Sequence, residues 1–256
     1  MVSIFQNPFC KLLSSWTTHS ESLHAHSKFS RSVSDICGVN VGASLIKPKH
    51  EIVNLGSVFN KNLCCNSQIN NTCRASFFAL SNIRKIRRYL DEHQAERLIH
   101  AFVSTRIDHC NSLLIGAPRS QLDKLQRVLN AAAKLVRRPK SNETTVDVLQ
   151  SLHWLPVVDR IAYKTLLLTF KARNGLGPEY LQSLLSEYNT SRRLRSSAQG
   201  LLTVPRSYTK SYGDGAFSIA APRLWNLLPV DIRNSNNVDI FKSKLKTFLF
   251  KKAYNL

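Results

Sequence analysis

The sequence predicts a mainly α-helical fold with a small β-hairpin near its N-terminal side. Of the 256 residues, 43% are hydrophobic, which is enough apolar side chain to build a core. From Cys73 onward, apolar residues recur at steps of three and four, the period of a helix that buries one face. Before that point, two short runs rich in β-branched residues flank a Pro-marked turn, which is typical of a hairpin.

Four segments follow from this pattern. Residues 1–38 are rich in Ser, His, Thr and Asn with little periodicity, so we expect them to be poorly ordered. In residues 39–72, the runs "VNVGASLIKP" and "EIVNLGSVFN" are predicted to pair as one hairpin. Residues 73–140 form a first helical region, and residues 141–256 form a second.

The first helical region is predicted to contain three helices. The stretch "SFFALSNIRKIRRYL" carries its apolar stripe on Phe77, Leu80, Ile83, Ile86 and Leu90. The stretch that ends at Gly116 and Pro118 predicts one long helix. Its apolar face comprises Ala95, Leu98, Ile99, Phe102, Val103, Ile107, Cys110 and Leu114. A third helix is expected to start at a Ser120 cap and to bury Leu122, Leu125, Val128, Leu129, Ala132, Leu135 and Val136.

The second region continues in helices. "TVDVLQSL" predicts a short helix, and "SLHWLPVVDRIAYKTLLLTFKARNG" predicts a longer one with Pro156 in its first turn and a stop at Asn174 and Gly175. After "GPEYLQSLL", another short helix, we expect strand residues near 201–205. A broken helix should then bury Phe217, Leu224 and Trp225. The last helix, "NVDIFKSKLKTFLFKKAY", begins at an Asn cap.

Charge points to a polyanionic partner. The formal net charge is +20 and the sequence pI is near 10.1, and such a field favours nucleic acid over an anionic membrane surface. Three clusters could contact phosphates: Arg84, Lys85, Arg87 and Arg88; Arg192, Arg193 and Arg195; and Lys242, Lys244 and Lys246. The alternative for each cluster is a solvated, charged face.

No enzyme motif is present. The sequence has no Gly-rich phosphate loop, no H-E-x-x-H and no G-x-S-x-G, so no catalytic residue is assigned. Asp108, His109 and Cys110 are adjacent, but consecutive helical positions point about 100° apart, which excludes a nucleophile–base pair among them. Trp154 is expected to be core rather than a base-stacking platform.

Neither metal, cofactor nor membrane is implied. Cys64, Cys65, Cys73 and His109 fit no standard zinc spacing, and the six cysteines form no regular framework, so a reducing compartment is the simplest interpretation. The N-terminus lacks the charged region of a signal peptide, and no apolar run is long enough to span a bilayer. We therefore expect an intracellular protein, cytoplasmic or nuclear, with no cofactor and no small-molecule substrate.

Seven ordered blocks carry a family resemblance. They are "ASFFALSNIRKIRRYL", "IHAFVSTRIDHCNSLLIGAP", "LDKLQRVLNAAAKLV", "LHWLPVVDRIAYKTLLLTFKARNGLGPEYL", "LRSSAQGLLTVPR", "YGDGAFSIAAPRLWNLLP" and "FKSKLKTFLF". Together they resemble the C-terminal part of the reverse-transcriptase polyprotein of jockey-like non-LTR retrotransposons, over roughly residues 40–256.

This resemblance implies a role for each segment. The hairpin would be the primer grip at the end of the palm, carried by Asn54, Leu55 and Gly56; residues 73–140 would be the thumb, and residues 141–256 a C-terminal extension. The chain departs from the family at Asn60, where Asp is usual. It departs again at Ile115 and Ala117, where the family commonly has Tyr-Gly-Leu-Pro.

The resemblance also implies what the chain lacks. The family's polymerase aspartates lie upstream of the matching region, and no endonuclease domain is present, so we expect a non-catalytic fragment that binds the backbone of RNA or of an RNA/DNA duplex. The alternatives are a degenerate transposon copy without selected activity, a polymerase or nuclease, and a helical protein-interaction module. The oligomeric state is left open.

Overall fold

The computed structural model describes residues 39–41, 44–46, 49–60, 64–139, 142–188, 200–207 and 213–256. The segment 1–38 and the loop with Arg192, Arg193 and Arg195 lie outside these ranges, so their predictions remain as they stand. Within the described residues the protein is mainly helical with small antiparallel hairpins near the N-terminal side, which confirms the predicted fold class.

The chain begins with strands β1 (Val39–Val41), β2 (Ser44–Ile46), β3 (Glu51–Asn54) and β4 (Ser57–Asn60). The helices of the first region are α3 (Asn66–Ile86), η3 (Arg87–Tyr89), α4 (Glu92–Ile99), η4 (His100–Ser104), α5 (Thr105–Asp108), η5 (Asn111–Leu114) and α6 (Arg119–Arg137). Those of the second region are α7 (Thr145–Ser151), α8 (Val157–Arg173), α9 (Glu179–Ser183), α10 (Phe217–Asn226), α11 (Val230–Arg233) and α12 (Val238–Tyr254).

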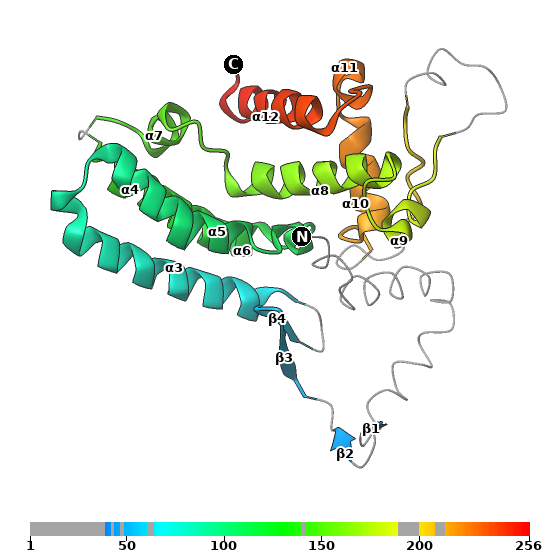
Figure 1. The fold of residues 1–256 in the computed structure, drawn as a ribbon, viewed down its shortest axis with the longest axis horizontal. Helices are drawn as coiled ribbons and strands as arrows, with labels where there is room; N and C mark the ends of the chain where they lie inside the picture. The colour runs from blue at the N-terminus through cyan, green and yellow to red at the C-terminus, as the bar shows by residue number, and fades with distance from the viewer. Residues whose placement is uncertain are drawn as a thin grey trace.

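These helices pack in layers. In Figure 1, α3 lies on one side of the molecule, α4 to α6 lie beside it, α8 follows, and α12 covers the far side of α8. None of the described helices is both long enough and apolar enough to cross a membrane.

The single predicted hairpin is wrong, because each of the two runs folds back on itself. β1 pairs with β2, and β3 pairs with β4. Only Leu55 and Gly56 connect β3 to β4, with φ of 49° and 81°. Two consecutive residues at positive φ make the tight turn whose twist matches that of the strands, so the second run closes locally.

The first predicted helix is longer than expected, and its buried stripe agrees with the predicted one at Leu80 and Ile83 only. It begins at Asn66, seven residues before Cys73, and its buried positions are Ile69, Ser76, Leu80 and Ile83. Phe77 and Ile86, predicted to be buried, are each nearly half exposed. Because Phe77 lies about 100° from Ser76 around the helix, burying Ser76 turns the ring toward solvent.

The predicted second helix is present but shorter than expected, because it does not reach Gly116. It contains the π-helical turn η4 and ends at Asp108, where His109 becomes extended; the left-handed Cys110, at φ 53°, follows. The buried residues Ile99, Val103 and Ile107 are four apart, and the wider π turn keeps that spacing on one face, where a regular α-helix would let it drift. Phe102 is consequently half exposed instead of buried.

The third helix buries all seven residues predicted for it. It begins at Arg119 after Pro118 rather than at a Ser120 cap, because the fixed φ of Pro118 already sets up the first turn. The predicted α7, α8, α9 and α12 are present, α8 with its Asn174–Gly175 stop and α12 with its Asn237 cap.

Two predictions near residues 201–226 need correction. The expected strand residues amount to one isolated bridge between Glu187 and Leu202. The predicted broken helix is continuous through Pro222, and it buries Trp225 fully, whereas Phe217 and Leu224 are half-buried. Pro222 is accommodated because it lies in the second turn of α10, so a single intrahelical hydrogen bond is lost.

Two hydrophobic cores meet at the Trp154–Leu155 corner. Trp154 belongs to the first core with residues of α3 to α7 and the start of α8, and Leu155 belongs to the second with residues of the later part of α8 and of α10 to α12. The Trp154 indole is almost fully buried and donates a hydrogen bond from Nε1 to Glu96 Oε1 at 3.0 Å. This confirms Trp154 as a core residue and explains why two adjacent large side chains sit at the corner.

Candidate nucleic-acid interface

Helices α3 and α6 form a parallel pair. Near their N-termini, Lys124 Nζ donates to Asn70 Oδ1 at 3.0 Å. At their C-termini, Arg87 donates from Nε to Leu135 O at 2.8 Å and from Nη2 to Val136 O at 2.7 Å. The pair runs side by side for the length of α6, with α4 and α5 packed on its inner side.

The outer face of this pair, here called the basic face, is rich in positive charge. Helical periodicity places the members from α3 and η3 on one side of α3, and it places those from α6 on one side of α6. They are Arg74, Arg84, Lys85 and Arg88 from α3 and η3, and Lys124, Arg127, Lys134 and Arg138 from α6, all exposed except the half-buried Lys124. Burial raises the pKa of the Cys73 thiol, and the positive charges of Lys124 and Arg127 oppose that rise, so both side chains act on the same point between the helices.

Little negative charge opposes the basic face. No acidic residue occurs between Glu51 and Asp91, so α3 and η3 contain none. The acidic residue of α6, Asp123, pairs with Arg119 at 3.1 Å, and Glu92 pairs with Arg137 at the edge of the bundle. The outward basic side chains therefore meet no neutralising carboxylate on their own helices.

Aromatic rings are interleaved with these charges. Phe78 and Tyr89 are each 71% exposed, and Phe77 is exposed as well. The Arg88 guanidinium lies 4.7 Å above the Tyr89 ring. Phe78 shares its helical line with Arg74 and Lys85, because residues four and seven apart fall on one side of a helix. Exposed rings among cations can stack on bases or ribose while the cations hold phosphates.

Arg87 does not belong to this surface, although the sequence suggested it. It is 6% exposed, and its third hydrogen bond runs from Nη1 to Leu90 O at 2.6 Å. Burial lowers the pKa of the Arg87 guanidinium, and the charge of Arg138 lowers it further. The physical reason is that Arg87 follows Leu80 and Ile83 on the inward stripe of α3, where it binds the last carbonyls of α6.

The predicted primer-grip residues lie apart from the basic face. Asn54, Leu55 and Gly56 form the β3–β4 turn, which is held by a contact of 3.1 Å between His109 Nε2 and Leu55 O. The turn borders an open cavity of about 530 Å³, whose lining includes Thr72 of α3. This cavity lies on the α5 side of α3, whereas α6 lies on the other side.

The predicted lysine cluster on α12 is also separate. Lys242 is engaged by Asp239 at 2.9 Å, and Lys244 donates to Asp231 O at 3.1 Å, so Lys246 is the most free of the three. Figure 1 shows α12 on the far side of α8 from α3. The structure thus does not bring these lysines together with the basic face.

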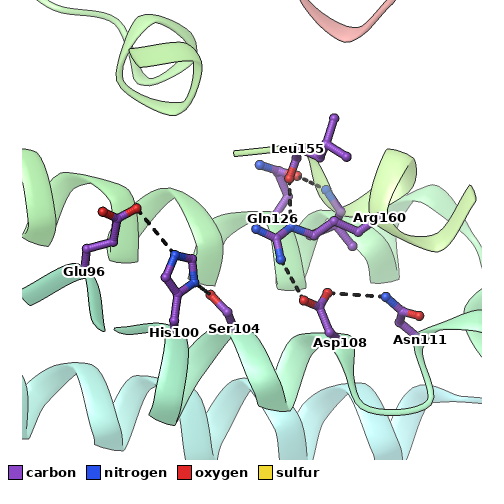
Figure 2. Close-up of polar contacts among 9 residues, drawn as sticks. Glu96, His100, Ser104, Asp108, Asn111, Gln126, Leu155 and Arg160 are labelled. Carbon is purple, nitrogen blue, oxygen red and sulfur yellow. Dashed lines mark hydrogen bonds and ion pairs between the residues drawn. The ribbon is translucent and has the colours of Figure 1, made fainter. Parts of the chain in front are cut away.

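A polar network that the sequence did not suggest joins the two regions of the chain (Figure 2). Arg160 of α8 donates from Nη1 to Asp108 Oδ2 at 2.8 Å and from Nε to Leu155 O at 2.9 Å. The backbone N–H of Val157 donates to Gln126 Oε1 at 2.9 Å. These contacts fix the start of α8 against α5 and α6, so the network serves to hold the corner.

A second, separate set of polar contacts in Figure 2 resembles a catalytic chain in composition. Figure 2 shows His100 between Glu96 and Ser104, with His100 Nδ1 3.2 Å from Ser104 Oγ and His100 Nε2 3.4 Å from Glu96 Oε1. Ser104 is 5% exposed, and Glu96 Oε1 also accepts from the Trp154 indole. A buried hydroxyl cannot reach a substrate, so this chain supports Trp154.

The prediction that His109 and Cys110 lie on a helix and point apart is wrong. The helix has already ended at Asp108, and Cys110 Sγ lies 3.6 Å from His109 Nε2. Their contact is a consequence of the left-handed Cys110, and both side chains line a second, smaller cavity of about 130 Å³ next to β4. Within the described ranges, no three or more His, Cys, Asp or Glu side chains are grouped closely enough to hold a metal ion.

The sequence predicted three of the eight residues of the basic face. Arg84, Lys85 and Arg88 were predicted, whereas Arg74 and the four residues of α6 were not. The signal was present, since Lys124, Arg127, Lys134 and Arg138 recur at steps of three, four and seven. What the sequence did not show was that α6 lies parallel to α3.

No protein-family model, curated protein or solved structure matches this chain. The relation to reverse transcriptases therefore stays a prediction from the sequence blocks.

Proposed function

We propose that this chain binds the backbone of RNA or of an RNA/DNA duplex through the basic face of α3 and α6. It would do so as a non-catalytic fragment related to the thumb of a non-LTR retrotransposon reverse transcriptase. The observation that carries the proposal is the parallel pair of helices with eight outward cations and no acidic residue on α3. The relation to the retrotransposon family rests on the sequence blocks alone.

The dimensions of the basic face suit a duplex. A helix rises 1.5 Å per residue, so α3 extends about 30 Å, close to one turn of a nucleic-acid duplex. Cations along that length can meet several successive phosphates, and each contact releases counterions. Binding of this kind recognises the backbone and not the base sequence.

The test is fluorescence anisotropy with a labelled RNA/DNA hybrid at about 50 mM salt. A triple variant, Arg84→Gln, Arg88→Gln and Arg127→Gln, should weaken binding at least about 100-fold, because each phosphate contact contributes on the order of 1 kcal/mol. The matched control changes Arg97, Lys164 and Arg206 to Gln. These three side chains are exposed, carry the same total charge and lie off the basic face.

The two variants have the same net charge, so any difference in their affinity for the hybrid reports where the removed cations lie on the protein. Equal losses in both would mean that a diffuse field attracts the duplex, which would contradict a defined interface on α3 and α6. A third variant, Lys242→Gln, Lys244→Gln and Lys246→Gln, tests the separate lysine cluster of α12. We expect it to behave as the control does, because α12 lies on the far side of α8.

A further inference from the structure

Two neighbouring cavities lie between the β3–β4 hairpin and helices α3 and α5. The larger cavity has a volume of about 530 Å³ and the smaller one of about 130 Å³. The residues that line both of them are Val58, Gln68, Thr72, Arg106 and His109. Because Arg106 and His109 are exposed, the smaller cavity reaches the surface beside these two side chains. A small ligand can therefore enter it from solvent.

The smaller cavity is walled mainly by apolar side chains. Its walls come from β4, α3, α5, η5 and α6 and include Phe59, Ile69, Ile107, Leu113, Leu114 and Leu125. An apolar cavity of about 150 Å³ stays dry and takes up one benzene ring, so a similar volume fits one ring here. Cys64, Cys65 and Cys110 also line the cavity, and polarizable sulfur makes favourable contacts with aromatic rings. Size and lining together favour a single aromatic ring.

One hydroxyl in the wall of the smaller cavity lacks a partner. Ser57, the first residue of β4, is 2% exposed, and its Oγ is buried without a hydrogen-bond partner among the described residues. Ser57 lines the smaller cavity and not the larger one. A buried hydroxyl without a partner costs free energy, and a polar substituent on a bound ring would supply the missing hydrogen bond.

The boundary between the two cavities is positively charged. Arg106 donates from Nε to Phe102 O at 3.1 Å, and its Nη1 and Nη2 have no hydrogen-bond or ion-pair partner among the described residues. The described side chains that line the two cavities include no Asp or Glu. An anionic group at this boundary would meet two free guanidinium nitrogens and no opposing carboxylate.

We propose that the smaller cavity binds a small aromatic acid. The ring occupies the cavity, a hydroxyl on the ring pairs with Ser57 Oγ, and the carboxylate pairs with Arg106. Nη1 and Nη2 lie on one edge of the guanidinium, so the two oxygens of a carboxylate can accept from them side by side. None of the eight cations of the basic face lines either cavity, so this site does not rest on duplex binding.

The experiment titrates benzoate, 3-hydroxybenzoate and 4-hydroxybenzoate into the whole chain and follows the ligand by NMR. One of the hydroxybenzoates should bind about threefold to tenfold more tightly than benzoate, because its hydroxyl completes Ser57. Ser57→Ala should abolish this preference and leave benzoate binding unchanged. Since the Ser57 hydroxyl has no partner to lose, Ser57→Ala should not lower the Tm.

Two further variants test the carboxylate partner and the cavity itself. Arg106→Gln should weaken binding of the preferred acid about tenfold or more, whereas Arg97→Gln, an exposed change of the same charge away from both cavities, should not. Cys65→Leu fills the smaller cavity and should abolish binding. Cys73→Leu is the matched control, because it makes the same change at a half-buried thiol that lines neither cavity.

Several results would overturn the proposal. They are absence of saturable binding of all three acids to the wild type, a hydroxybenzoate preference that Ser57→Ala leaves intact, and binding that neither Arg106→Gln nor Cys65→Leu reduces. Cyclohexanecarboxylate that binds as tightly as benzoate would overturn the assignment to an aromatic ring. Phenol that binds as tightly as the preferred hydroxybenzoate would overturn the role of the anionic group.

Discussion

Replacement of Arg87 by methionine should destabilise the fold far more than the same change at its neighbour Arg88. Arg87 makes three hydrogen bonds of 2.6 to 2.8 Å to carbonyl oxygens, two of them at the end of α6. Bonds from a charged donor contribute about 1.5 to 3 kcal/mol each. Relief of the buried guanidinium charge offsets part of their loss, which leaves a net cost of about 3 to 5 kcal/mol.

Arg88 provides the matched control because it is exposed and stacks on Tyr89 alone. Loss of that exposed stacking costs about 0.5 to 1 kcal/mol. Urea denaturation followed by circular dichroism measures both variants, and Arg87→Met should also lower the Tm by roughly 6 to 20 °C. In the anisotropy assay, Arg88→Met should weaken hybrid binding. A cost below about 1 kcal/mol for Arg87→Met, or one no larger than that of Arg88→Met, would refute the role assigned to Arg87.

Three further results are expected. Trp154→Phe should lower the free energy of unfolding, measured by urea denaturation, by about 1 to 3 kcal/mol, because the smaller ring leaves a void and Glu96 loses the indole donor. An unchanged denaturation midpoint would contradict the role of this corner in joining the two cores. Burial, aided by the charge of Asp159, raises the pKa of the Tyr254 phenol to about 12, above the value near 10 of an unfolded chain. The phenol's contribution to the free energy of unfolding is therefore complete below pH 10 and is lost as pH rises through 12. Tyr254→Phe should flatten this part of the stability profile, and an unchanged slope would count against burial of the phenol. Hydrogen exchange should show broad protection across α6 and α8, whereas fast exchange throughout would favour a decayed transposon copy that does not fold.

Periodicity predicted the elements whose burial follows a simple helical repeat. The seven core residues of α6 and the Asn cap of α12 are of this kind. It failed where a local conformation interrupts the repeat. The left-handed Cys110 and the π turn before it depend on packing against α3 and α8, and a helical wheel drawn from the sequence assumes neither.

The candidate interface was predicted in part for a similar reason. A run such as Arg84 to Arg88 shows that charge is present, but the direction of each side chain depends on where the buried stripe of α3 lies. That stripe passes through Ser76 instead of Phe77, which turns Arg87 inward and leaves Arg84 and Arg88 outside. The contribution of α6 depends on a parallel packing of distant segments, which no local pattern carries.

The salt dependence of hybrid binding tests the central claim most directly. If all eight cations of the basic face contact phosphates, the logarithm of the association constant should fall against the logarithm of salt concentration with a slope of about −7, and if half do, about −3.5. The triple variant at Arg84, Arg88 and Arg127 should reduce the magnitude of that slope by about 2.7, close to one for each lost cation. No binding at about 50 mM salt, or a slope that the triple variant leaves unchanged, would contradict duplex binding through α3 and α6.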